Sequence, residues 1–411
     1  MIKTLYLTWL IPSFIFGHSL GELVSLSVEN KLIESSKMNI ESTQKEYESV
    51  KAKYLPQISL GAKYEITNKE TSSVADNMNV IYANLKYIIY DGGKKGNTYD
   101  IYETNILSAK ENLLYLKNQT ALQVVNNYYN YMSLTSQKEA KLKHIEQLQA
   151  QYKRLKQFLE AGTTTSDEVD KIISRVQSAK VVLHEIELNI QTILHNLEYI
   201  VGRTVSISGN SKIKEYTSRE DSLRADLKAL ELDMKSLFFS AKAEKSDYFP
   251  TIYLDDTYYR YDLKYETAAY NAFSAKYAQN IISLNLSWNI FGFGTTQDAY
   301  KSVYKKYTAL KSRYEYEKNK ANIDLKLAKK AYEIGKLKIF SAEAALKAAS
   351  STYETIKNKY QNGLVDNVAY LEALSEKYTA ESQLKSAAYD LEIKKANIIY
   401  HSGKEIQEFI Q

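Results

Sequence analysis

Residues 282–290 read ISLNLSWNI, a stretch in which every second side chain is large and apolar. The apolar positions alternate with serine and asparagine, which is the period-two pattern of a β-strand with one apolar and one polar face. Residues 57–66, QISLGAKYEI, alternate in the same way. Each run is about ten residues long, the length of a tilted strand that crosses a membrane. A strand with one face on a soluble core has the same pattern, so the strands alone leave both alternatives open.

Proline marks the point at which each of these strand regions begins. Pro56 and Pro250 each follow a polar helical pattern and precede an alternating one. Because proline ends a helix and is tolerated at the start of a strand, both are expected at helix–strand junctions.

Glycines recur along the chain at one constant spacing. Gly93, Gly162 and Gly202 are each followed by another glycine 201 residues later. Landmarks that keep their spacing over more than a hundred residues indicate an internal duplication. We therefore predict two structural repeats, residues 20–209 and 210–411, each made of a helix, two strands and a long helical hairpin.

A glycine-containing turn follows the second strand of each repeat. Residues 90–93 read YDGG and residues 291–294 read FGFG. Glycine at a strand–helix turn permits a positive φ, and the turn glycines are Gly92, Gly93, Gly292 and Gly294. The Gly-x-Gly of the second turn lacks the third glycine and the βαβ context of a nucleotide site.

Two helical stretches of about 60 residues follow these turns, at 97–160 and 295–361, and each would be roughly 90 Å long. The chain holds only 3 prolines and 14 glycines, so little interrupts them. Apolar residues between Val169 and Ile200 step by three and four without a break, and a shorter seam occupies 142–159. That period is typical of coiled coils, so we expect the helices to pack side by side in a tube or rod.

The helical hairpins are expected to turn at Gly162 and Gly363, with Thr163 and Leu364 next to them at the tips. Ser166 and Asp366 are the predicted N-caps of the returning helices. The first turn after Ser166 is acidic, which suits the positive end of a helix dipole.

Composition excludes several functional classes. The net charge is only +5 and the charges are spread along the helices, which does not indicate nucleic-acid binding. Cysteine is absent, and the 5 histidines show neither metal-ligand spacing nor a Ser-His-Asp arrangement. We therefore predict no enzymatic activity, no cofactor and no metal site.

The first 19 residues resemble a secretory signal peptide, with Lys3, an apolar stretch from Leu5 to Phe16, and small residues before a cleavage site after Ser19. A short membrane anchor or an N-terminal core strand is the alternative. An exported chain with four membrane strands cannot close a barrel alone, because open strand edges are forbidden in lipid. Three chains would supply twelve strands, which lies in the known range.

The duplicated plan resembles the TolC family of outer-membrane efflux proteins. The resemblance rests on residues 55–58 (LPQI), on 248–250 (YFP), on the YDGG turn before a long helix, and on the two glycine hairpins. It implies a mainly α fold with membrane β-strands: four strands and long coiled-coil helices per chain, forming a trimeric 12-stranded β-barrel continued by a periplasmic α-helical barrel. It also implies a location in the Gram-negative outer membrane, contact with its lipid, and two partners, a periplasmic adaptor protein and an inner-membrane transporter.

The function implied is the passive exit duct of a tripartite efflux pump or a type I secretion system, for small molecules or secreted proteins. The resemblance places a gate near the hairpins and adaptor docking at their tips. The family often has a basic residue two positions after the second hairpin glycine and an acidic one six positions after it. Here those positions are Val365 and Ala369, whereas a second acidic position, nine after the glycine, matches Glu372. The gate charges therefore differ from those of the family, and Asp366 and Glu372 are the candidate pore-gate residues, which could form acidic rings in a trimer. Asp366 would alternatively only cap its helix, and Glu372 would only be solvated.

A periplasmic coiled-coil adaptor or scaffold is the alternative function. It would share the signal peptide and the seams but would not need two matched pairs of strands. The tyrosine-rich stretch from Tyr258 to Tyr270 is interpreted as an extracellular loop or an aromatic belt.

Overall fold

A computed structural model describes residues 17–216 and 222–411. Most of the predicted signal peptide, residues 1–16, lies outside the described residues. Ser19, its predicted last residue, is described. It is the N-cap of the first helix, where its side chain accepts from the Glu22 amide at 3.3 Å.

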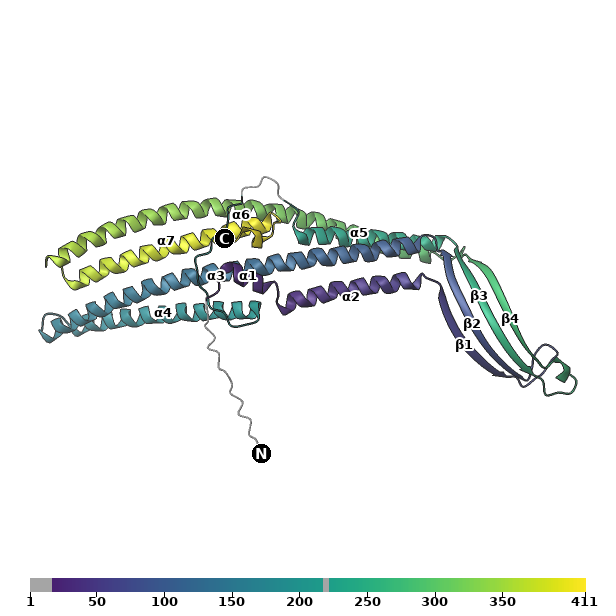
Figure 1. Cartoon of the computed structure of the whole chain (residues 1–411). Coiled ribbons are helices and arrows are strands. Elements are labelled where there is room, and N and C mark those ends of the chain that lie inside the picture. The colour runs from purple at the N-terminus through teal and green to yellow at the C-terminus, as the bar shows by residue number, and fades with distance from the viewer. Residues whose placement is uncertain (1–16, 217–221) are drawn as a thin grey trace, which may run out of the picture. The chain divides into compact units, whose positions relative to one another are not determined.

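The elements follow one another in the order helix, strand pair, long helix, helix, and this order occurs twice (Figure 1). The helices are α1 (Leu20–Ser27), α2 (Lys31–Lys53), α3 (Lys94–Glu160), α4 (Ser166–Val201), α5 (Ala225–Lys245), α6 (Thr295–Gln361) and α7 (Asn367–His401). The strands are β1 (Gln57–Ile66), β2 (Asn77–Tyr90), β3 (Thr251–Lys264) and β4 (Ala275–Ser287). Three short 3₁₀ turns, η1 (Ser246–Tyr248), η2 (Asn271–Phe273) and η3 (Ile406–Phe409), complete the described elements.

The described residues form two compact units. The hairpin unit comprises the described residues of 1–35, 113–225 and 318–411, and the sheet unit comprises 36–112 and 226–317. Each unit takes elements from both predicted repeats, so a boundary near residue 209 is not a boundary between compact units. The two repeats remain a prediction about how the sequence is organised.

The sheet unit holds one antiparallel sheet of four strands in the order β1-β2-β3-β4. Directly paired residues point to the same side of a sheet, and the register brings large apolar side chains together on one side. Ile58 pairs with Leu85, and Leu254 pairs with Leu284. The apolar face is not covered within the sheet unit: Leu60 is 81% exposed and Leu284 is 69% exposed. A face of that kind does not suit the soluble alternative considered above.

The strands confirm part of the sequence prediction and correct the rest. β1 covers the predicted residues 57–66. β4 ends at Ser287, so the alternation through Trp288 and Ile290 continues beyond the ladder. The interpretation of residues 258–270 as a loop is wrong for its first half, because β3 runs to Lys264 and includes three of the tyrosines.

The hairpin unit has two cores. The first is formed by buried side chains of α1, α3, α4, α7 and η3, among them Leu23, Val124, Leu197 and Ile399. The second lies between α3 and α4 and includes Ile145, Leu148, Ile172, Val176 and Ala179. The predicted seam of α4 is therefore confirmed as its buried face. In α3 the predicted seam is only partly right, because Leu142 is 45% exposed, and Leu148, which the predicted seam omitted, is buried.

No helix in the described part of the chain is long and apolar enough to span a membrane.

Candidate functional site

The candidate site in the hairpin unit lies at the turns of its two helical hairpins. In the first, the Thr163 amide donates to the Phe158 carbonyl at 2.8 Å and the Gly162 amide donates to the Leu159 carbonyl at 3.0 Å. This pair of bonds is a Schellman motif, which requires a left-handed residue, and Gly162 has φ +70°.

The second hairpin repeats the same turn 201 residues later. The Leu364 amide donates to the Lys359 carbonyl at 2.8 Å, the Gly363 amide donates to the Tyr360 carbonyl at 3.0 Å, and Gly363 has φ +72°. Gly363 and Leu364 are exposed, as are Gly162 and Thr163 of the first turn. All four candidate docking residues therefore lie at accessible hairpin tips.

The caps that follow the two turns differ. The predicted cap Ser166 is wrong by one residue: Thr165 is the N-cap of α4 and makes no side-chain capping bond. Asp366, as predicted, is the N-cap of α7, and its carboxylate accepts from the Ala369 amide at 2.9 Å. Thr165 and Asp366 are themselves 201 residues apart, so the turn length is the same in both hairpins and only the capping residue changes.

Asp366 also connects the two hairpins. Its carboxylate forms an ion pair with the guanidinium of Arg154, near the end of α3, and that guanidinium lies over the Phe158 ring at 5.1 Å. A groove of about 470 Å³ adjoins the pair and is lined from both hairpins, including Glu146, Lys153 and Leu371. One carboxylate thus caps one hairpin and ties it to the other.

Glu372, the second candidate gate residue, is exposed and has no ion-pair partner among residues 17–216 and 222–411. The acidic first turn of α4 is different, because Lys171 contacts Asp167 at 3.3 Å and Glu168 at 2.6 Å. Hydrogen bonds from Thr165 and Lys171 lower the pKa of Asp167. Asp167 and Glu168 therefore contribute to the local electrostatics of α4, whereas Glu372 has no such partner among the described residues.

Sequence reasoning missed a tyrosine cluster beside the second turn. The rings of Tyr360 and Tyr370 stack at 4.9 Å, and the hydroxyls of Tyr353 and Tyr370 lie 3.3 Å apart. That hydrogen bond, with burial, raises the pKa of Tyr353 to about 12. Tyr353 and Tyr360 are seven residues apart on α6, a spacing that could have identified their common face.

The candidate residues of the sheet unit lie where helices meet strands. Pro56 separates α2 from β1, and Pro250 separates η1 from β3. Gly92 (φ +70°) and Gly93 (φ +87°) form the turn from β2 into α3. A Cβ at Gly92 would lie 2.4 Å from the Ser246 carbonyl oxygen, so this position needs glycine for its space as well as for its φ.

The corresponding turn before α6 differs from the expectation. Gly294 has φ +86°, but Gly292 does not have a positive φ, and Phe293 takes the left-handed conformation with φ +50°. Phe293 lies 201 residues after Gly92, so the left-handed position keeps the spacing of the other turn residues although it is not a glycine here.

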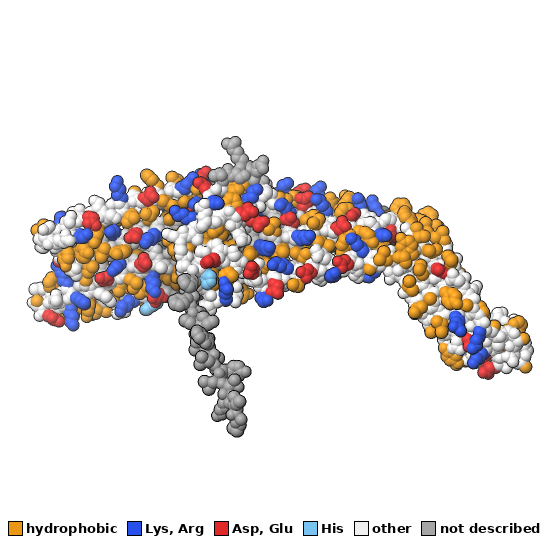
Figure 2. Space-filling model, viewed as in Figure 1, with side chains coloured by type: hydrophobic (Ala, Val, Ile, Leu, Met, Phe, Trp, Pro, Cys, Tyr) orange, Lys and Arg blue, Asp and Glu red, His pale blue; other side chains and the backbone are white. Residues whose placement is uncertain are grey.

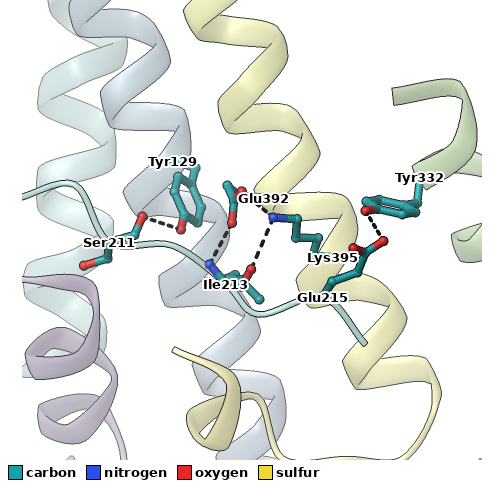
Figure 3. A network of polar contacts seen from close by, with 7 residues as sticks. All are labelled: Tyr129, Ser211, Ile213, Glu215, Tyr332, Glu392 and Lys395. Atoms are coloured by element: carbon teal, nitrogen blue, oxygen red, sulfur yellow. Dashed lines mark hydrogen bonds and ion pairs between the residues drawn. The ribbon is translucent and has the colours of Figure 1, made fainter. Parts of the chain in front are cut away.

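A polar network holds the linker 203–216, which joins α4 to the second half of the chain (Figure 3). The Glu392 carboxylate accepts from the Ile213 amide at 2.7 Å, and the Lys395 ammonium donates to the Ile213 carbonyl at 3.2 Å and to Glu392 at 2.7 Å. The Tyr129 hydroxyl donates to the Ser211 carbonyl at 3.0 Å, and burial raises its pKa. These hydrogen bonds fix the backbone of the extended linker against α3 and α7.

The Tyr332 hydroxyl donates to Glu215 at 2.6 Å, beyond Ile213 on the same linker (Figure 3). Burial, then this hydrogen bond, raises the pKa of Tyr332 to about 12. No three His, Asp or Glu side chains are grouped as a metal site would need in the described ranges.

A four-stranded sheet with an uncovered apolar face, joined to two long coiled-coil hairpins, defines a class of protein: subunits of outer-membrane channels. Solved structures of this class are similar over almost the whole chain. The Vibrio cholerae outer membrane protein VceC is 14% identical with a TM-score of 0.78, over 94% of this chain and 96% of its own. The Campylobacter jejuni CmeC outer membrane channel is 16% identical with a TM-score of 0.79, over 95% of this chain and 86% of its own. The open state of the Neisseria gonorrhoeae MtrE outer membrane channel is 14% identical with a TM-score of 0.71, over 94% of this chain and 89% of its own.

The comparison with curated protein sequences finds no match. The family model for outer membrane efflux proteins matches residues 23–203 and 218–403, and the chain belongs to this family. The predicted fold class and outer-membrane location are confirmed. The chain is an outer-membrane channel protein with a large periplasmic helical portion.

Proposed function

We propose that three copies of the chain form the exit duct of a tripartite efflux pump, through which small molecules or secreted proteins pass passively from the periplasmic side to the outside. The proposal gives the chain no catalytic step and no cofactor. The observation that carries it is the sheet, which has an uncovered apolar face and two edge strands, β1 and β4, each paired on one side only.

In a membrane, the edge strands β1 and β4 would each need a further strand to pair with, because an unpaired backbone group in lipid costs several kcal/mol. Joining β4 of one copy to β1 of the next would satisfy both edges. Three copies would supply twelve strands, a number within the known range of membrane barrels. The face opposite the apolar one suits a wet interior, because Asn84 donates to Asp255 at 3.0 Å and to Thr257 at 2.7 Å there.

The hairpin unit supports the same assembly. A row of exposed apolar residues follows one side of α6 in steps of three, four and seven: Ile323, Leu327, Ile334, Leu337 and Phe340. Their exposed fractions lie between 55% and 73%. α4 also presents Val181 and Leu188, 57% and 68% exposed. Apolar rows on long helices favour packing against another helix, and the next copy of the chain is the proposed neighbour.

The accessible tips, Gly162, Thr163, Gly363 and Leu364, are the proposed contact with a periplasmic adaptor, and an inner-membrane transporter would supply the energy. Asp366 and Glu372 are the proposed acidic residues of the periplasmic entrance. Like charges repeated around a threefold axis would favour the entry of cations over anions.

The assembly is tested by density-gradient separation of cell membranes with chemical cross-linking. We expect the chain in outer-membrane fractions, with a cross-linked species of three times the protomer mass. Leu327→Asn is expected to reduce the trimer, whereas Lys326→Asn, about 100° away around the same helix, is expected to leave it unchanged. A periplasmic monomer or dimer that is not bound to membrane would disprove the proposal and favour the adaptor or scaffold alternative.

A further inference from the structure

The first described residues of the chain are paired with the start of the linker 203–216. The His18 amide donates to the Ser206 carbonyl at 2.7 Å, and the Ser208 amide donates to the His18 carbonyl at 3.1 Å. His18 and Ile207 thereby form a parallel β-bridge. Both backbone groups of His18 are therefore used in the fold of the hairpin unit.

Ser19 has a second structural role, at the start of α1. Its hydroxyl accepts from the Glu22 amide at 3.3 Å, and the Glu22 carboxylate accepts from the Ser19 amide at 2.8 Å. The two bonds form a capping box, which satisfies donors that the N-terminus of a helix otherwise leaves unpaired. The next residue, Leu20, is fully buried in the first core of the hairpin unit. The fold therefore begins at His18 and not at Leu20.

Cleavage of the signal peptide after Ser19, which the small residues alone indicate, would remove these contacts. The bridge to the linker and both bonds of the capping box would be lost. Hydrolysis would also leave an ammonium group on Leu20, at the positive end of the α1 dipole and next to a buried side chain. A mature chain that began at Leu20 would thus be less stable than one that keeps His18 and Ser19.

Gly17 offers a cut that keeps both residues. It is small, as the position directly before a signal cleavage site must be, and it follows the apolar stretch from Leu5 to Phe16 at once. Cleavage there loses the hydrogen bond from the Ser208 hydroxyl to the Gly17 carbonyl, which is exposed and so contributes little. The cut after Gly17 satisfies the requirement of the peptidase and that of the fold.

We propose that a signal peptidase cleaves the chain between Gly17 and His18, so that the mature protein begins at His18. Water is added across this amide: its oxygen goes to Gly17 as a carboxylate, and both of its protons go to the His18 nitrogen as an ammonium. The ammonium still has a proton for the Ser206 carbonyl, which the His18 nitrogen faces at 2.7 Å. The new terminus therefore keeps the bridge to the linker.

The surroundings of His18 suit a charged terminus. A surface hollow of about 560 Å³ adjoins it, and the lining includes the exposed side chains of Glu22 and Arg203. An ammonium there stays in contact with water, and the Glu22 carboxylate favours its positive charge. Figure 2 shows that charged side chains of both signs are spread along the helices on the face in view, so a further charge fits this kind of surface.

The cut is tested by reading the first residue of the mature protein. The chain is expressed from its full sequence, purified from membranes, and examined by N-terminal sequencing and intact mass. We expect His18 as the first residue. A chain that begins at Leu20 would overturn the proposal, and so would one that retains residues before His18. The readout is independent of the number of copies in the channel and of what it conducts, so the proposed function is tested separately.

Ser19→Asp distinguishes the two cuts. Aspartate is a good N-cap, so α1 keeps its start, but a charged residue does not suit the position directly before a cut. We expect this variant to be processed as fully as the parent and to begin at His18. Gly17→Val, which puts a branched residue before the proposed cut, is expected to abolish the product that begins at His18. Accumulation of precursor in Ser19→Asp would place the cut after residue 19 and overturn the proposal.

The structural basis is tested with the leader unchanged. Deletion of residues 18 and 19 lets the same cut after Gly17 produce a chain that begins at Leu20, and we expect it to lose heat stability in detergent. His18→Ala combined with Ser19→Asp is the matched control, because it keeps the backbone bonds to the linker and an N-cap. Equal heat stability of the deletion and the control would show that the two residues contribute nothing to the fold and would overturn the proposal.

Discussion

Ile213 is an apolar residue whose backbone is held by charged side chains. Its amide donates to Glu392 and its carbonyl accepts from Lys395, while its own side chain is 2% exposed. The ion pair is itself largely buried, with 15% of the Glu392 side chain and 17% of the Lys395 side chain exposed. Removing one partner of such a pair therefore leaves both a charge and a backbone group unsatisfied.

Glu392→Ala is expected to lower the free energy of unfolding by about 2–4 kcal/mol, because it leaves the Lys395 charge and the Ile213 amide without their partner. Glu392→Gln retains an acceptor oxygen for that amide and is expected to cost less. Denaturant unfolding of the purified chain in detergent measures both. Equal losses for alanine and glutamine would show that the amide bond contributes little and that the charge pair dominates.

The tyrosine pair at the second hairpin predicts a pH dependence. The pKa of Tyr353 is raised from 10.0 to about 12, first by its hydrogen bond with Tyr370. The folded state therefore holds the proton more tightly than the unfolded state. The stabilisation is complete below about pH 10 and is lost as the pH rises towards about 12.

Tyr353→Phe is expected to reduce the loss of stability over that pH interval. Tyr360→Phe is the control, because Tyr360 contributes a stacked ring and makes no hydroxyl contact with Tyr370. Thermal unfolding across the interval compares them. The other tyrosines titrate in both variants, so an identical slope in the two would contradict the assignment to Tyr353.

At the scale of elements, the turn glycines Gly363 and Gly92 are required for different reasons. Gly363 needs only its left-handed φ, because a Cβ there would meet nothing within 4 Å. Gly92 needs a left-handed φ and also lies against the Ser246 carbonyl. Gly363→Ala is expected to cost about 1–2 kcal/mol, the conformational penalty alone. Gly92→Ala is expected to cost more, and a heat-stability comparison that found the two equal would contradict the clash.

The element order and the long helices could be predicted from the sequence because their signals are long. Period-two alternation located β1, and steps of three and four located the buried face of α4. Single-residue features were less predictable. The N-cap of α4 is Thr165 and not Ser166, because both hairpins have the same number of residues between the glycine and the N-cap. Serine and threonine are similar capping residues, so residue type alone did not distinguish the two positions.

The extent of β3 could not be predicted from the alternation of apolar and polar residues. The tyrosines of β3 suggested a loop, although tyrosine is common in strands. Pairing with β2 and β4 on both sides includes them in the ladder. The turn before α6 was also unpredictable, because Phe293 takes the left-handed conformation without being a glycine. Ile213 lies 179 residues from Glu392 and 182 from Lys395, and Asp366 lies 212 residues from Arg154, so no local pattern could indicate these contacts.

The predicted duplication agrees with a pair of side-chain interactions in the sheet unit. Lys51 lies over the Tyr99 ring at 5.9 Å, and Lys245 lies over the Tyr300 ring at 4.3 Å. The lysines are 194 residues apart and the tyrosines 201, which are the spacings of the prolines and of the turn glycines. In each predicted repeat, the same cation–π contact therefore joins the helix before the strands, α2 or α5, to the long helix after them.

At the scale of the whole molecule, the ion pair between Arg154 and Asp366 is the one contact described above that ties the two hairpin tips through charge. Both side chains are about two-fifths exposed, at 41% and 43%. A pair with that exposure contributes at most about 1 kcal/mol to stability. Its effect should therefore appear in the position of the tips and not in the stability of the fold.

Arg154→Met and Asp366→Asn are both expected to raise the single-channel conductance of the reconstituted protein in a planar bilayer, since each frees one hairpin from the other. Asparagine is also a good N-cap, so Asp366→Asn leaves the start of α7 intact while removing the charge. Lys153→Met is the matched control, because Lys153 lines the same groove and forms no ion pair among the described residues. Unchanged conductance in both Arg154→Met and Asp366→Asn would mean that the tips are held by contacts other than this pair. A rise in Asp366→Asn alone would instead assign the effect to the negative charge at the entrance, because Arg154→Met leaves that charge in place.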